Sequence, residues 1–322
     1  MIADSSLPNA QFSTGSGSLL LCFEVSVSSS SPSSPPLTVD HSQGIRLAAM
    51  GVLVLSFDAL LIRLAGADPW DVAFWRGTLM ALSMSGVLLV TGKLKQFALL
   101  RRYWKGMLLL AGMYGINGLL FVLSVSHTSA ANTVVILSSS SFFAAFFSWL
   151  WLREKVLTRT WVAIGVSIGG VVIVFAGSLG MENWLGDLLA LALALSMGMM
   201  LTLMRRFPEL PRIPIVALSG VIMLLLAAPF SEPLTLEGDS YLWLAVMGLI
   251  QIPLASVLIM SATRYLSSPE VSLFLLIETV FGPIWVWVVL NEQVPLMTMI
   301  GGSAILGAIF VHSWISLRSI GK

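Results

Sequence analysis

Charged residues are scarce in this sequence. Asp, Glu, Lys and Arg make up 10% of the 322 residues, whereas residues of the AVILMFWYC set make up 57%. This balance excludes an ordinary soluble domain, in which about a quarter of the residues are charged, and implies that lipid solvates much of the chain. Cysteine is nearly absent, because Cys22 alone can form neither an internal disulfide nor a thiolate metal site.

Long apolar stretches begin after an N-terminal segment of different composition. Ser and Pro dominate residues 1–43, and no Lys or Arg precedes Arg46. Such a segment buries too little apolar area to offset its ordering entropy, so we expect a disordered tail. From Gly44 onward the apolar stretches have the length of about 20 residues that crosses a bilayer as a helix. The sequence predicts an all-α membrane protein with ten transmembrane helices, at 44–65, 70–91, 104–125, 130–152, 160–178, 184–204, 213–230, 241–262, 269–290 and 296–316.

The distribution of charge predicts the orientation of these spans. With the N-terminus inside, all but two of the 17 Lys and Arg fall in inner segments, and the two exceptions, Arg63 and Arg76, lie within spans. The predicted outer segments carry acidic residues instead. Basic residues favour cytoplasmic loops, so we expect a multi-pass protein of the cell membrane with both termini cytoplasmic.

The second half of the chain repeats the first. Residues 127–170 align without a gap to residues 265–308, and Trp149 and Trp287, and Glu154 and Glu292, are identical pairs. We therefore expect one five-helix repeat at 44–178 and a second at 184–316, inserted in opposite directions because five is odd. Inverted repeats are typical of secondary transporters that work by alternating access. The small-residue pairs Gly165–Gly169 and Ser303–Gly307 are expected to let helices pack closely, within one chain or across a homodimer.

Three segments resemble the drug/metabolite transporter superfamily, and within it the EamA type. They are FDALLIRLAGADPWDVAFWRG, WLREKVLTRTWVAIGVSIGGVVIV, and SSPEVSLFLLIETVFGPIWVWVVLNEQ with its mid-helix Pro283. The resemblance covers about residues 44–316 and implies ten helices, inward termini and a central cavity for small organic solutes. The family includes exporters of amino acids and related metabolites. Where it commonly has a proline in the fourth span, this chain has Ser140 and Ser141, which puts the expected kink in doubt.

Ionisable and polar groups inside the spans are the candidate site residues, because they are costly in lipid. At 1.5 Å per residue, Asp58 lies about 21 Å from the inner end of its helix and Arg76 about 9 Å from the outer end, hence at similar depth. Asn117 comes to about the same level. Glu278 lies near the midplane, where it could exchange protons. For Asp58 and Arg76 two roles are open, a structural ion pair and contact with substrate. Arg63, nearer the edge, is expected to anchor its helix at the membrane interface.

These observations predict a secondary transporter, and an exporter in particular, of small organic metabolites such as amino acids. A channel or a non-transporting membrane sensor is the alternative. An enzyme is not expected, because no HExxH motif and no nucleophile with a base is found within a span. No metal site, cofactor or nucleic-acid partner is expected either. The predicted partners are a small-molecule substrate and membrane lipid, and the sequence is also compatible with a homodimer.

Overall fold

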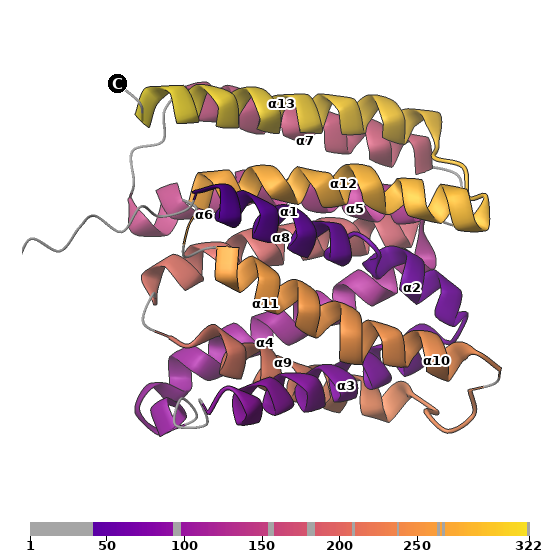
Figure 1. The fold of residues 1–322 in the computed structure, drawn as a ribbon. Coiled ribbons are helices and arrows are strands. Elements are labelled where there is room, and N and C mark those ends of the chain that lie inside the picture. The colour runs from indigo at the N-terminus through magenta and orange to yellow at the C-terminus, as the bar shows by residue number, and fades with distance from the viewer. Residues whose placement is uncertain are drawn as a thin grey trace, which may run out of the picture. The chain divides into compact units, whose positions relative to one another are not determined.

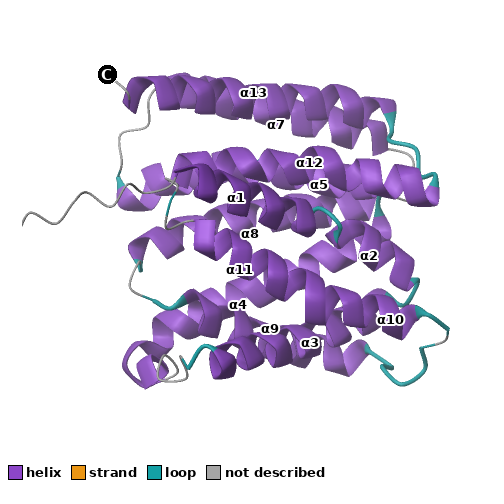
Figure 2. Ribbon diagram, viewed as in Figure 1, coloured by secondary structure: helices purple, strands orange, loops and turns teal. Residues whose placement is uncertain are grey.

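The computed structural model describes residues 41–92, 98–153, 158–178, 184–207, 210–236, 238–262, 265 and 268–320. The described part of the chain is helical and contains no strand, which confirms the all-α prediction (Figure 2). Most of the predicted N-terminal tail, residues 1–40, lies outside the described residues. Its last three residues, 41–43, belong to the first helix, so this helix begins before the predicted span.

The first half of the chain contains five predicted spans. Two of them are interrupted: the first is divided at Ser56–Phe57 and the fourth at Ser139. The elements are α1 (His41–Leu55), α2 (Asp58–Ala65), α3 (Pro69–Val90), α4 (Ala98–His127), α5 (Ala130–Ser138), α6 (Ser140–Phe147), the π-helical turn η2 (Ser148–Leu152) and α7 (Thr158–Ser178).

The second half contains the other five. Its third span passes through a π-helical segment, whereas its fourth span continues unbroken across Pro283. The elements are α8 (Trp184–Arg206), α9 (Arg212–Ala227), the short 3-10 turn η3 (Ala228–Phe230), α10 (Ser240–Ala245), η4 (Val246–Gln251), α11 (Ile252–Ala262), α12 (Ser268–Leu290) and α13 (Leu296–Ile320).

The lengths of the apolar segments agree with ten membrane crossings. In the part of the chain that the structure describes, eight helical segments are long and apolar enough to cross a membrane, and two shorter apolar segments, Ile277–Leu290 in α12 and Leu296–Val311 in α13, complete the set. Large apolar side chains remain exposed on the bundle, among them Leu82, Val172 and Leu225. A soluble monomer rarely leaves so much apolar surface in water, so this surface is the one that faces lipid.

The helices pair as two equivalent halves would. The second and seventh spans pack together as α3 and α9, and the fifth and tenth as α7 and α13 (Figure 1). The third span packs on the sixth through α4 and α8. When the two halves are exchanged, the corresponding pair is the eighth span with the first, and α11 does contact α1. The tertiary contacts therefore follow the internal repeat seen in the sequence.

Close helix crossings occur at glycines other than those predicted. A Cβ on Gly77 of α3 would lie 2.7 Å from the carbonyl oxygen of Gly220 in α9, and a Cβ on Gly170 of α7 would lie 2.7 Å from that of Gly301 in α13. At Gly165, Gly169 and Gly307, in contrast, an added Cβ would meet no described atom within 4 Å. The prediction that these three glycines bring helices together is therefore wrong within the chain. The close contact between α7 and α13 lies instead on the helix face that carries Gly170 and Gly301.

Candidate functional site: a central polar cavity

A cavity of about 200 Å³ lies between the two halves of the bundle. The four residues predicted from membrane depth all line it, although they come from the first, second, third and ninth spans. Most of the remaining wall is apolar. The polar lining consists of Asp58, Arg76, Tyr114, Asn117, Ser138, Ser140, Ser141, Glu278 and Thr279.

Asp58 and Arg76 form a bidentate ion pair in the wall of this cavity. Arg76 Nη1 donates to Asp58 Oδ1 over 2.6 Å, and Nη2 donates to Oδ2 over 2.8 Å. Both residues are buried, at 4% and 9% exposure. The guanidinium also lies 3.4 Å from the sulfur of Met247 and 5.8 Å from the ring centre of Phe121. The fork of Arg76 is therefore occupied in this structure.

The break in the first span places Asp58 at a helix N-terminus. Because α2 begins at Asp58, the carboxylate sits at the positive end of that helix, which favours it. At the break, the N–H of Phe57 donates to the carbonyl of Val54 over 3.4 Å, and Gln251 Nε2 donates to the carbonyls of Val54 and Leu55 over 3.4 and 3.3 Å. In addition, Trp285 Nε1 donates to Ser56 Oγ over 2.9 Å. The second repeat thus stabilises the break in the first.

Asn117 of α4 presents an unsatisfied acceptor. Its Nδ2 lies 3.5 Å from the sulfur of Met200 and 3.7 Å from that of Met197. Its Oδ1 is buried and has no hydrogen-bond partner, and the residue is only 6% exposed. Buried polar atoms without a partner are rare in folded proteins. This atom therefore requires an explanation.

Glu278 of α12 also lacks a direct partner. It is half-buried, and among the residues that the structure describes no hydrogen bond or ion pair reaches its carboxylate. It shares the cavity with the charged groups of Asp58 and Arg76. The prediction that this midplane carboxyl has no fixed partner agrees with the described residues, while its function stays a prediction.

The fourth span is interrupted without a proline. Ser138 Oγ and Ser139 Oγ each donate over 2.6 Å to a carbonyl three residues earlier, those of Val135 and Ile136. Serine hydroxyls that bond back to the backbone compete with helical hydrogen bonds and bend helices. The interruption lies at Ser139, between the ends of α5 and α6, in the span where the resemblance implied a proline, and Ser138 lines the cavity.

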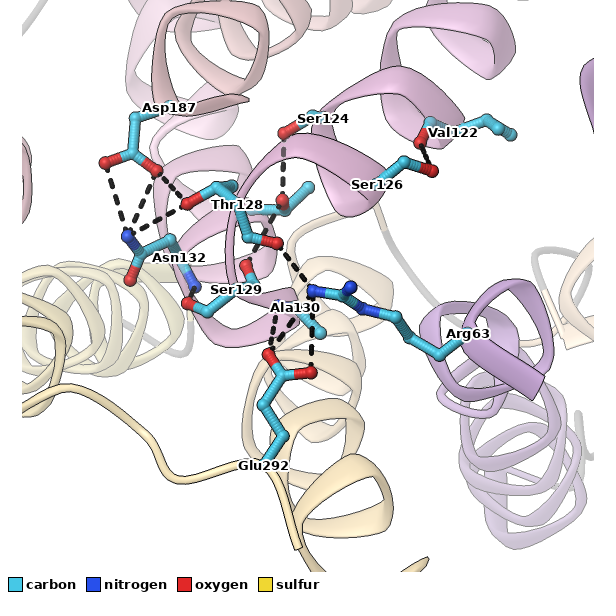
Figure 3. Close-up of polar contacts among 11 residues, drawn as sticks. Arg63, Val122, Ser124, Ser126, Thr128, Ser129, Ala130, Asn132, Asp187 and Glu292 are labelled. Carbon is cyan, nitrogen blue, oxygen red and sulfur yellow. Dashed lines mark hydrogen bonds and ion pairs between the residues drawn. The ribbon is translucent and has the colours of Figure 1, made fainter. Parts of the chain in front are cut away.

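A second polar cluster lies at one end of the bundle. The chain turns at this end at residues 66–68, 128–129 and 291–295, and we call it the Glu292 end. Here Arg63 Nη2 donates to the carbonyl oxygen of Thr128 over 2.7 Å and lies 3.4 Å from Glu292 Oε2 (Figure 3). Glu292 Oε1 also accepts from the backbone N–H of Ala130 over 3.0 Å. Sequence reasoning assigned Arg63 to the membrane interface alone and missed these contacts.

Asp187 is the buried centre of the same cluster. It is 0% exposed, and it accepts from Thr128 Oγ1 over 2.6 Å and from Asn132 Nδ2 over 3.0 and 3.2 Å. Thr298 of α13 in turn donates to Asn132 Oδ1. Figure 3 shows Asp187 and Glu292 on opposite sides of the turn at Thr128 and Ser129. We call Arg63, Thr128, Asn132, Asp187, Glu292 and Thr298 the closing network; none of these residues lines the cavity.

Sequence reasoning did not single out the buried members of the closing network. Asp187 was counted only as an acidic residue of an outer segment, and Asn132 carried no signal of its own. The internal repeat offered two hints, the identity of Glu154 with Glu292 and that of Thr160 with Thr298. Glu154 lies outside the described residues.

Comparisons with known proteins agree with this architecture. No curated protein matches the chain. One solved crystal structure has a TM-score of 0.62 at 18% sequence identity, with 86% of this chain and 98% of that chain covered. That likeness shows the fold. The model of the EamA-like transporter family matches residues 42–176 and 184–314, one match in each half. The chain therefore belongs to the EamA-like transporter family.

Proposed function

We propose that this protein is a secondary transporter that exports small organic metabolites, amino acids among them, across the cell membrane by alternating access. The observation that carries the proposal is the charged cavity between two repeats. Interrupted helices at the interface of inverted repeats are how many transporters build a substrate site. A volume of about 200 Å³ suits a solute of metabolite size rather than a drug-sized one, whose sites measure about 300–1,000 Å³.

The closing network supports alternating access. It joins α2 of the first repeat to the turn after α12 of the second, and α8 to the turn before α5. A movement of one repeat against the other would have to break these contacts. With the orientation that the charge distribution predicts, the Glu292 end faces outward and both termini are cytoplasmic. Export would then require opening of this end with substrate in the cavity.

Arg76 is the proposed contact for a substrate carboxylate. Its planar fork fits a carboxylate in a bidentate manner, and Asp58 occupies that fork in this structure. A substrate carboxylate would compete with Asp58 for it. Replacement by lysine keeps the positive charge but removes the fork. Arg76→Lys should therefore raise the apparent KM for an amino acid substrate about tenfold, the effect of losing one charge-assisted hydrogen bond.

The test is transport by the purified protein in vesicles, with a panel of radiolabelled amino acids. Saturable, counterflow-competent transport supports a carrier, whereas flux without saturation would indicate a channel. Arg212→Lys, at an exposed position outside the cavity lining, is the matched control and should leave KM unchanged. Absence of any substrate-dependent flux across the panel, from protein that is folded, would contradict the proposed function.

A further inference from the structure

We propose that the cavity holds the protonated amino group of its substrate between the Glu278 carboxylate and Asn117 Oδ1, so that small primary amines are its ligands whether or not they carry a carboxylate. This inference rests on the proposed function and deepens it. It concerns the part of the cavity that the ion pair of Asp58 and Arg76 leaves unused.

Asn117 supplies the first observation. Its Oδ1 is buried and has no donor in the structure, and the residue belongs to the cavity lining. The opposite orientation of the amide would place the oxygen against the sulfurs of Met197 and Met200, which are weak acceptors and cannot donate. The observed orientation is therefore the better one, and it leaves a residue of the cavity lining with an acceptor that has no donor. A ligand that donates to this oxygen would remove the cost of leaving it unpaired.

Glu278 supplies the second observation, independent of the first. It is another acceptor on the cavity wall, and no described residue donates to it. The charges of Asp58 and Arg76 compensate one another in a bidentate pair, so an ionised Glu278 leaves the lining with one negative charge in excess. A buried charge is stable when it is paired and hydrogen-bonded. A cationic donor would neutralise the excess negative charge and would donate hydrogen bonds to both acceptors.

An ammonium group fits these acceptors better than a metal ion does. Among the residues that the structure describes, no group of three or more His, Cys, Asp and Glu could hold a metal. An ammonium carries three donors and needs only oxygen acceptors, which the carboxylate and the amide provide. The apolar side chains of Phe121, Leu193 and Val134 line the same cavity and would cover the alkyl part of such a ligand.

The experiment measures equilibrium binding at fixed pH to the purified full-length protein, with three probes that share one side chain. They are leucine, 3-methylbutylamine, which lacks the carboxylate, and 4-methylpentanoate, which lacks the amino group. On the unaltered chain, leucine and the amine should bind, and the acid should bind at least about tenfold more weakly, as expected when one charged hydrogen-bonding group is lost. A role of Glu278 in proton coupling alone would not produce this preference.

Three variants locate the amino group. Glu278→Gln and Asn117→Leu should each weaken binding of 3-methylbutylamine by about tenfold, whereas Asn117→Asp, which keeps an acceptor, should retain it. Ser126→Ala on the same helix is the control, because its hydroxyl bonds back to the carbonyl of Val122. Equal or tighter binding of the acid than of the amine, or unchanged amine affinity in folded Glu278→Gln and Asn117→Leu, overturns the inference and leaves the proposed function standing. Failure of all three probes to bind, together with no transport across the amino acid panel, overturns both.

Discussion

Two arginines near the start of the bundle are held in different ways. Arg76 and Asp58 both belong to the first repeat, make two contacts of 2.6 and 2.8 Å and are almost fully buried. Arg63 and Glu292 belong to different repeats, approach to 3.4 Å, and have side chains that are 29% and 27% exposed. A tight pair within one repeat moves with it as a unit. A loose, half-exposed pair between repeats can break at small cost, as a conformational change requires.

The largest expected effect is on the buried pair. Arg76→Met leaves the Asp58 carboxylate buried without its partner, which should cost about 3–5 kcal/mol of folding stability. Folded yield and thermal unfolding in detergent measure this loss. The double variant Asp58→Leu with Arg76→Met removes both charges and should recover most of the stability, because well-packed apolar residues often replace a buried ion pair without loss.

The same double variant separates a structural role from a transport role. If Arg76 contacts substrate, the double variant should fold but should transport amino acids with a raised KM or not at all. Normal transport by the double variant would show that the pair is structural only. The comparison with Arg63→Met, which breaks the exposed pair, should show a much smaller loss of stability.

The second effect concerns Asp187, the buried centre of the closing network. Asp187→Ala removes the carboxylate that accepts from the Thr128 hydroxyl and from Asn132 Nδ2, at a cost of about 1–3 kcal/mol. Asp239→Ala, an exposed carboxylate in a chain turn that makes no side-chain cap, is the control and should be nearly neutral. Equal unfolding temperatures of the two variants would contradict the role of Asp187 in holding α8 to the turn at Thr128.

The ten helices and the four cavity residues could be predicted from the sequence. Span length is set by the bilayer, and an ionisable side chain such as Asp58, Arg76 or Glu278 avoids lipid, so counting residues along each span brings these groups to one depth. Nothing local predicts the break at Ser56–Phe57. It depends on Gln251 and Trp285, which are about 200 residues away in the chain and contact it only in the folded bundle.

Within the chain, the glycine prediction failed for a geometric reason; packing across a homodimer stays a prediction. Gly169 and Gly170 are adjacent in sequence, yet successive residues of a helix point about 100° apart, since a turn takes 3.6 residues. Only Gly170 faces α13, where a Cβ would meet Gly301. Spacing alone does not say which face of a helix meets its neighbour. The same limit applies to Asp187, whose burial depends on the approach of α8 to Thr128.

The smallest effect on stability, and the most informative one on mechanism, is expected from Glu292→Gln. The amide oxygen can still accept from the N–H of Ala130, but the charge that attracts Arg63 is lost. Exposed ion pairs contribute about 0–1 kcal/mol, so folding should hardly change. The same energy acts on the balance between a closed and an open Glu292 end, and 1 kcal/mol is about a fivefold change in an equilibrium constant.

Cysteine labelling measures this opening. In a chain that carries Cys22→Ser and Ser138→Cys, the new thiol lies in the cavity wall. A membrane-impermeant maleimide added from outside should label it up to about fivefold faster when Glu292→Gln is also present. Glu232→Gln, an exposed carboxylate at the same end of the bundle, is the matched control. Because labelling reports opening and the unfolding temperature reports folding, an unchanged labelling rate would show that the pair of Arg63 and Glu292 does not hold this end closed, whatever its effect on stability.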